Sequence, residues 1–166
     1  GFAQAALFAN IASAPFIMQE HYGFTPLDFS ICFGVNALAV VIAAALAVKF
    51  KRVENGTLAG GVGLLVFSVC EMVALFAGCS FWVYEVFMLC ILFSLGLCFT
   101  SSTTLAMDKG RMYSGSASAL LGAVSFAFGG VVSPLVGMGN LMHSTGIVFV
   151  VCAVCSLLCI YVAKEH

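Results

Sequence analysis

The chain alternates long apolar runs with short polar segments. The core of a bilayer requires about 17–25 predominantly apolar residues in each crossing helix. Applied to this sequence, that length predicts six transmembrane helices, over residues 2–18, 29–48, 58–77, 82–107, 116–139 and 146–163. Residues 1–166 are therefore predicted to form one all-α membrane domain, because the connecting segments leave no room for a separate soluble domain.

The positive charges support the same number of crossings. All six Lys and Arg residues follow the second, fourth or sixth predicted helix: Lys49, Lys51, Arg52, Lys109, Arg111 and Lys164. The segments after the other three helices contain acidic and His residues, but no Lys or Arg. Because cytoplasmic loops collect Lys and Arg, we expect both chain ends in the cytoplasm.

Composition separates a membrane protein from a soluble helical bundle. Hydrophobic residues make up 63% of the chain and charged residues 8%, whereas soluble domains contain about 25% charged residues. The lipid bilayer is therefore the predicted surrounding. No basic cluster is large enough to predict a nucleic-acid partner. The chain starts at Gly1 inside an apolar run, without the charged region of a signal peptide, and is interpreted as a segment of a longer protein.

The cysteines do not predict a disulfide framework. Seven of the eight lie inside predicted helices, where a free Cys behaves as a small apolar residue. Cys152, Cys155 and Cys159 recur at helical spacing, and we interpret them as a packing or lipid-facing stripe in preference to a site for a soft metal. No metal or other cofactor is expected.

Five polar residues lie at predicted membrane depth and are candidates for lining a substrate cavity: Gln4, Asn10, Asn36, Thr100 and Ser101. Such residues face the interior of a bundle or a water-filled path. The hydroxyls in the fourth helix have an alternative, since Ser and Thr also bond back to their own helix. Asn36 is the stronger candidate, because its amide requires several partners.

Glu71 is the acid placed deepest in a predicted helix. A charge at the bilayer centre costs about 2.5–3.5 kcal/mol on insertion scales. Gly61, Ser68 and Glu71 share one small, polar face, which we expect to meet another helix. A proton-carrying role and a neutral structural carboxyl both remain open. Glu85, near the start of its helix, is expected to reach the membrane surface.

Two helices carry break signals. The fifth predicted helix contains small residues on one face and a proline: Gly122, Gly130, Ser133, Pro134 and Gly137. Small residues let helices approach closely, and a proline inside a helix removes a backbone hydrogen bond. Close packing and a bend at a moving interface both explain them. Pro15 in the first helix predicts a kink, either as a simple helix end or as part of a gate.

The connecting segments carry local signals for starts and turns. Thr25-Pro26 with Asp28 predicts an N-cap and a helix beginning near Pro26. Asn55-Gly56 predicts a turn before the third helix. The short segment 78–81 predicts that the third and fourth helices form an antiparallel pair.

No enzyme constellation is found. The run Ser114-Gly115-Ser116-Ala117-Ser118 is faintly similar to intramembrane serine proteases. That chemistry requires a His beside the nucleophilic serine. The serines are predicted at the inner boundary, and His21 and His143 lie in the outer loops. The protein is therefore not expected to be an enzyme.

Longer strings are similar to a known family. Residues 114–123, with Phe126, Gly130 and 133–137, resemble the eleventh helix of major facilitator drug:proton antiporters of the bicyclomycin- and chloramphenicol-resistance branch. Residues 14–19 resemble the end of that family's seventh helix, and residues 33–38 its eighth. This resemblance implies that the chain forms helices seven to twelve, one half of a twelve-helix bundle in a bacterial inner membrane.

The resemblance also implies a function and partners. The missing N-terminal six-helix half would be the partner, and the two halves would enclose a cavity for a small-molecule substrate. The leading hypothesis is proton-driven efflux of small amphipathic compounds or drugs. Metabolite uptake by the same fold, and a stand-alone six-helix structural or homodimeric membrane protein, are the alternatives.

Overall fold

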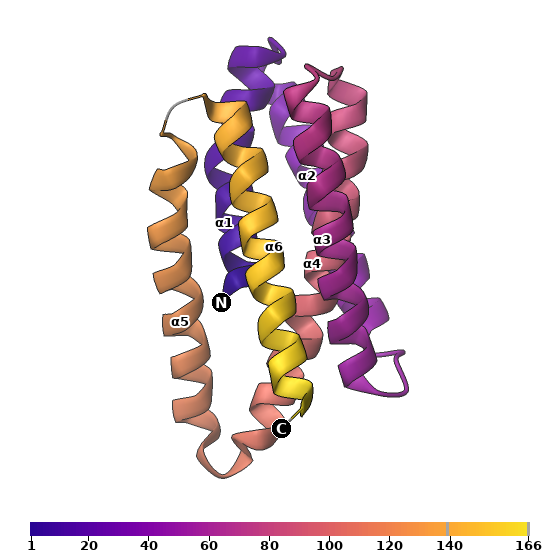
Figure 1. Ribbon diagram of the computed structural model, residues 1–166, viewed down its shortest axis with the longest axis vertical. Coiled ribbons are helices and arrows are strands. Elements are labelled where there is room, and N and C mark those ends of the chain that lie inside the picture. Colours follow the sequence, from indigo (N-terminus) through magenta and orange to yellow (C-terminus); the bar gives the residue numbers. More distant parts are fainter. Residues whose placement is uncertain (139, 166) are drawn as a thin grey trace.

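The computed structural model describes residues 1–138 and 140–165, and over these residues the regular structure is entirely helical. The elements are α1 (Phe2–Pro15), η1 (Phe16–His21), α2 (Pro26–Ala47), α3 (Val53–Phe76), α4 (Phe81–Lys109), η2 (Arg111–Tyr113), α5 (Ser114–Val136) and α6 (Leu141–Glu165). The long helices run up and down along a common axis (Figure 1). The predicted last residue of the fifth helix, Gly139, lies outside the described residues.

Six complete crossings are not confirmed. Five helices, α2 to α6, are long and apolar enough to cross a membrane, whereas α1 has 14 residues. Gly1 lies midway along the bundle, next to Val124 and Phe128 of α5, and not at the end where six full crossings would place it (Figure 1).

The positive charges gather at one end, as their sequence positions predict. The loops after α2 and α4 lie at the same end of the molecule (Figure 1), and the five Lys and Arg side chains that the structure describes are exposed there: Lys49, Lys51, Arg52, Lys109 and Arg111. We call this the basic end. The opposite end contains η1, the start of α2 and the α3–α4 turn.

Local signals fix several boundaries. The Thr25 hydroxyl accepts a hydrogen bond from the Asp28 backbone N–H at 3.2 Å, and the Asp28 carboxylate accepts one from the Thr25 N–H at 3.3 Å. This capping box starts α2 at Pro26, as predicted. At the end of α3, Gly78 adopts a positive φ of 66°. The Gly78 and Cys79 N–H groups bond back to α3 carbonyls, which ends the helix as a Schellman motif.

The predicted turn at Asn55-Gly56 is wrong. Both residues lie in the first turn of α3, which begins at Val53. Gly56 is buried against the Ser101 side chain of α4, and a Cβ at this position would collide with the Ser101 hydroxyl. The absence of a side chain at Gly56 therefore allows α3 and α4 to cross closely, and it does not mark a turn.

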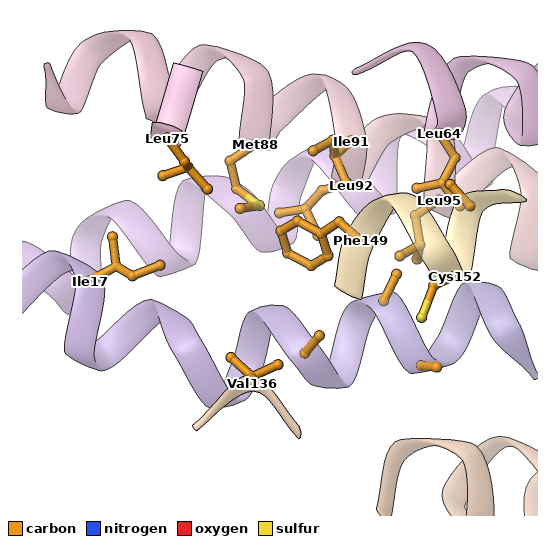
Figure 2. Packing of buried hydrophobic residues seen from close by; sticks show 14 of the residues in the cluster. Ile17, Leu64, Leu75, Met88, Ile91, Leu92, Leu95, Val136, Phe149 and Cys152 are labelled. Atoms are coloured by element: carbon orange, nitrogen blue, oxygen red, sulfur yellow. The ribbon is translucent and has the colours of Figure 1, made fainter. Parts of the chain in front are cut away.

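The core is centred on α4, which packs extensively against α3 and α2. Buried residues of α4 meet Leu64 and Leu75 of α3 and Phe149 of α6 in one apolar cluster. Figure 2 shows the Phe149 ring directed at the middle of α4, beside Leu92. α5 lies at the edge and packs mainly on α1.

Glycines produce the closest helix contacts. A Cβ on Gly60 of α3 would overlap the backbone of Cys98 in α4, and one on Gly96 of α4 would lie 2.8 Å from the Val40 carbonyl of α2. These helices can approach only because both positions lack a side chain.

Candidate functional site

The five predicted cavity residues do not form one polar surface. Asn10, Asn36 and Ser101 are buried, whereas Gln4 and Thr100 are partly exposed. They come from three helices: Gln4 and Asn10 from α1, Asn36 from α2, and Thr100 and Ser101 from α4. The two α4 residues lie in the half of that helix nearer the basic end (Figure 1). The set is therefore spread along the bundle.

The surroundings of these residues differ. Ser101 faces Gly56 of α3, so it lies at a helix crossing. The Thr100 carbonyl accepts a hydrogen bond from the Thr104 hydroxyl at 2.8 Å, which is the back-bonding that the sequence left open. The side-chain oxygens of Gln4 and Asn10 are buried without a hydrogen-bond partner among the described residues.

The small residues of α5 face mostly outward. Of its glycines, Gly129 is buried and pressed against the ring of Phe8 in α1, whereas Gly122 and Gly130 have open space where a Cβ would lie. Pro134 is exposed in the last turn, and α5 continues as one α-helix through it to Val136. The helix is followed by Gly137, which is exposed, and Ser133 is partly exposed. The predicted bend therefore stays a prediction.

Pro15 marks a change of helix type. The regular α-helix ends at Pro15, and the chain continues as a wider π-helix over η1. The Tyr22 N–H then bonds to the Ile17 carbonyl at 3.1 Å, five residues back. A break is thus present where the sequence predicts one, and single π-helical turns are frequently found at functional sites.

A buried polar cluster at the opposite end of the bundle contains Asn36, Glu71, Tyr84 and Glu85. Glu71 and Tyr84 are 0% exposed, Asn36 is 2% and Glu85 8% exposed. Both Glu71 carboxyl oxygens, both amide atoms of Asn36, the Tyr84 hydroxyl and one Glu85 oxygen lack a hydrogen-bond partner among the described residues. Unpartnered polar atoms at this burial are rare and call for an explanation.

The members of this cluster interact across three helices. The Glu71 and Glu85 carboxyls are near enough to interact electrostatically, and Tyr84 interacts with both. The Asn36 amide approaches the Glu85 carboxyl from α2, although the two do not meet hydrogen-bond geometry in the part of the chain described. The expectation that Glu85 reaches the surface is therefore wrong, because α2 packs over this part of α4.

The prediction for the Glu71 face is confirmed: Ser68 and Glu71 are fully buried, and Gly61 packs against Ile160 of α6. Sequence reasoning found Asn36 and Glu71 but not their convergence with Tyr84 and Glu85. The short turn between α3 and α4 could have revealed this. Residues at equal distances before and after a short turn between antiparallel helices lie side by side, and Glu71 and Glu85 are such a pair.

An aromatic cap lies beyond this cluster, at the opposite end. It consists of Tyr22, Phe24 and Phe81, with ring centroids 5.5 Å apart for Tyr22 and Phe81 and 4.3 Å apart for Phe24 and Phe81. The Tyr22 hydroxyl donates to the Cys79 carbonyl at 3.0 Å. Burial, together with the contact with Cys79, raises the pKa of Tyr22 well above its usual value, so this donor stays protonated.

Two open hollows lie at the basic end. One, of about 680 Å³, is lined by Thr103, Thr104, Asp108 and Arg111 among others, and the second, of about 440 Å³, lies beside Lys49 and Phe50. Neither contains a residue from the predicted cavity set. The structure therefore separates the buried carboxyls from the basic end.

Comparison with known proteins supports a transporter half. The chain is 34% identical to the uncharacterized MFS-type transporter YdgK of Bacillus subtilis (strain 168), over 89% of this chain and 40% of that protein. The chain thus spans less than half the length of this relative. No family model matches the chain, and no solved structure matches it.

Two conclusions follow from this similarity and the structure. The apolar helices and the major facilitator relative support an integral membrane protein, and they support its assignment as part of a major facilitator-type bundle. The relative's name gives no substrate and no coupling ion, and it does not distinguish the bicyclomycin-resistance branch from others.

Proposed function

We propose that the chain is the C-terminal half of a secondary transporter that exports small amphipathic compounds in exchange for protons. The observation that carries this proposal is the similarity to an MFS-type transporter over most of the chain and 40% of the relative. The resemblance of the α5 string 114–123 to drug:proton antiporters supplies the direction and the coupling ion.

The shape of the bundle supports a missing partner. Only 11% of the apolar window of α2 and 11% of that of α5 is buried within the bundle. In the proposed transporter, the exposed faces of these two helices meet the N-terminal half. Gly122, Gly130 and Pro134 lie on the open side of α5, where small residues permit a close second helix.

The break after Pro15 and the small-residue face of α5 are the proposed moving parts. Discontinuous helices line the substrate path in many transporters. Thr100 is the member of the α4 pair that is not fully buried, and we propose that it contacts substrate together with Gln4. Asn10, Asn36 and Ser101 are buried and instead support the helices that line the path.

A flux measurement tests the function. The full-length protein that contains this chain is reconstituted into vesicles, and the uptake or release of a fluorescent amphipathic cation is followed under an imposed pH gradient. We expect movement of the dye against the direction of proton flow, and its loss when the gradient is collapsed. Transport with the proton flow, or transport of polar metabolites instead, would favour the uptake alternative. No flux with either class would refute the proposal.

A further inference from the structure

The antiparallel pair of α3 and α4 brings two acids to one depth. Glu71 lies five residues before the end of α3 at Phe76, and Glu85 four residues after the start of α4 at Phe81. At a rise of 1.5 Å per residue, the two lie roughly 7.5 Å and 6 Å from the turn between the helices. These helices are in extensive contact, so the two carboxyls share one layer of the bundle.

No positive side chain balances these acids in the part of the chain described. The five Lys and Arg residues whose side chains the structure describes follow α2 or lie at or just after the end of α4, at the basic end, and the α3–α4 turn lies at the opposite end (Figure 1). His21 and His143 are exposed at the opposite end, where they make edge-to-face contacts with Tyr22 and Phe76. Two ionised carboxylates without a cation would repel one another in a medium of low dielectric.

The neighbouring polar groups are neutral ones. Asn36 and Cys32 of α2 lie near Glu85, and Tyr84 lies near both acids. Tyr22, whose hydroxyl is engaged by Cys79, is the titratable neighbour from the aromatic cap. An amide and a phenol can each donate a hydrogen bond to a carboxylate. These neutral neighbours can therefore stabilise a state in which one of the two carboxyls is ionised and the other is protonated.

We propose that Glu71 and Glu85 form a proton-binding pair that shares a single proton between its two carboxyls. Two carboxyl groups that share a site do not both ionise readily, because the charges repel. Asn36 and Tyr84 hold the remaining charge.

Glu85 is the less buried member of the pair. Glu71 is 0% exposed, whereas Glu85 is 8% exposed and lies at the junction of α2 and α4. The aromatic cap closes the turn, and Met88, Ile91 and Leu92 form apolar packing on the side of the bundle centre. This inference deepens the proposed proton coupling and names the site that would carry it.

Labelling with a hydrophobic carbodiimide tests the pair, since the reagent modifies protonated carboxyls in apolar surroundings. The protein is used in the length in which the cell makes it, in lipid nanodiscs, and labelled peptides are identified by mass spectrometry. We expect rapid labelling of Glu71 or Glu85, because one of the two carries the shared proton. Above the midpoint, the rate falls about tenfold per pH unit, as the protonated fraction does.

Variants on the same two helices provide controls. Glu71→Gln with Glu85→Gln should abolish the rapid labelling, whereas Glu54→Gln in α3 and Asp108→Asn in α4 change exposed acids and should leave it unchanged. An infrared band of a protonated carboxyl in the unmodified protein provides a second measurement that does not depend on folding of a variant.

Several outcomes would overturn the pair. These are labelling that persists in the double variant, protection by sodium at constant pH, and absence of the infrared band at pH values where labelling is rapid. The flux experiment fails separately: an intact pair without proton-driven export refutes the proposed function, whereas export without labelling refutes the pair.

Discussion

α4 and α5 have nearly the same mean hydropathy, but 56% of the apolar window of α4 is buried in the bundle and only 11% of that of α5. In a water-soluble protein the sequence would reveal this difference, because a helix exposed to water has a polar face. In lipid it does not, because hydrocarbon tails are as apolar as Leu and do not force apolar side chains inward. The two helices therefore differ in packing and not in hydropathy.

The largest expected effect comes from a pair of leucine truncations. Leu95 of α4 is 1% exposed and Leu120 of α5 is 65% exposed. Leu95→Ala should lower the free energy of unfolding by about 2–5 kcal/mol, because it leaves a cavity. Leu120→Ala should have little effect. Unfolding by SDS in mixed micelles, followed by circular dichroism, checks both. Equal losses would show that α5 is packed as tightly as α4.

Glycine substitutions test the close approaches. Gly60→Ala places a Cβ on the α4 backbone and should cost about 1–3 kcal/mol through overpacking. Gly122→Ala meets open space and should be neutral or stabilise α5 slightly, since Ala favours helix. The same unfolding assay measures the difference. A destabilising Gly122→Ala in the full-length protein, without effect in this chain alone, would show that a second bundle covers α5.

Within α5, neighbouring glycines should behave oppositely. Gly129 meets the Phe8 ring and Gly130 meets nothing. Gly129→Ala should cost about 1 kcal/mol, because the ring must shift. Gly130→Ala should raise the midpoint of thermal unfolding slightly. If both variants behaved alike, α5 would not pack on α1 through this face.

The smallest effect is expected at the start of α2. Removal of the Thr25 hydroxyl in Thr25→Ala breaks an exposed capping box and should cost about 0.5–1 kcal/mol. Thr25→Ser keeps the acceptor and is the matched control. Hydrogen exchange of the first turn of α2 should rise in the alanine variant alone. Faster exchange throughout α4 as well would contradict a local effect.

Much of the helical arrangement was predictable because its signals are local. The capping box at Thr25, the glycine turn at Gly78 and the charges at one end all depend on residues within a few positions of one another. The predictions that were wrong depended on contacts with residues far away in the sequence. Asn55-Gly56 resembles a turn in sequence, but Ser101 of α4 determines its role. Glu85 lies near a helix start, but α2 covers it.

The sequence by itself determined that lipid surrounds these helices, where most of them begin and end, and which end of the bundle carries the positive charge. Those properties follow from apolar run length, caps and charge position, each readable along one segment. Only the tertiary structure decided that α4 is central, that α5 is open, and that Glu71, Glu85, Asn36 and Tyr84 are buried near one another. Such contacts join residues on different helices, and in an apolar solvent hydropathy does not reveal which helix faces meet.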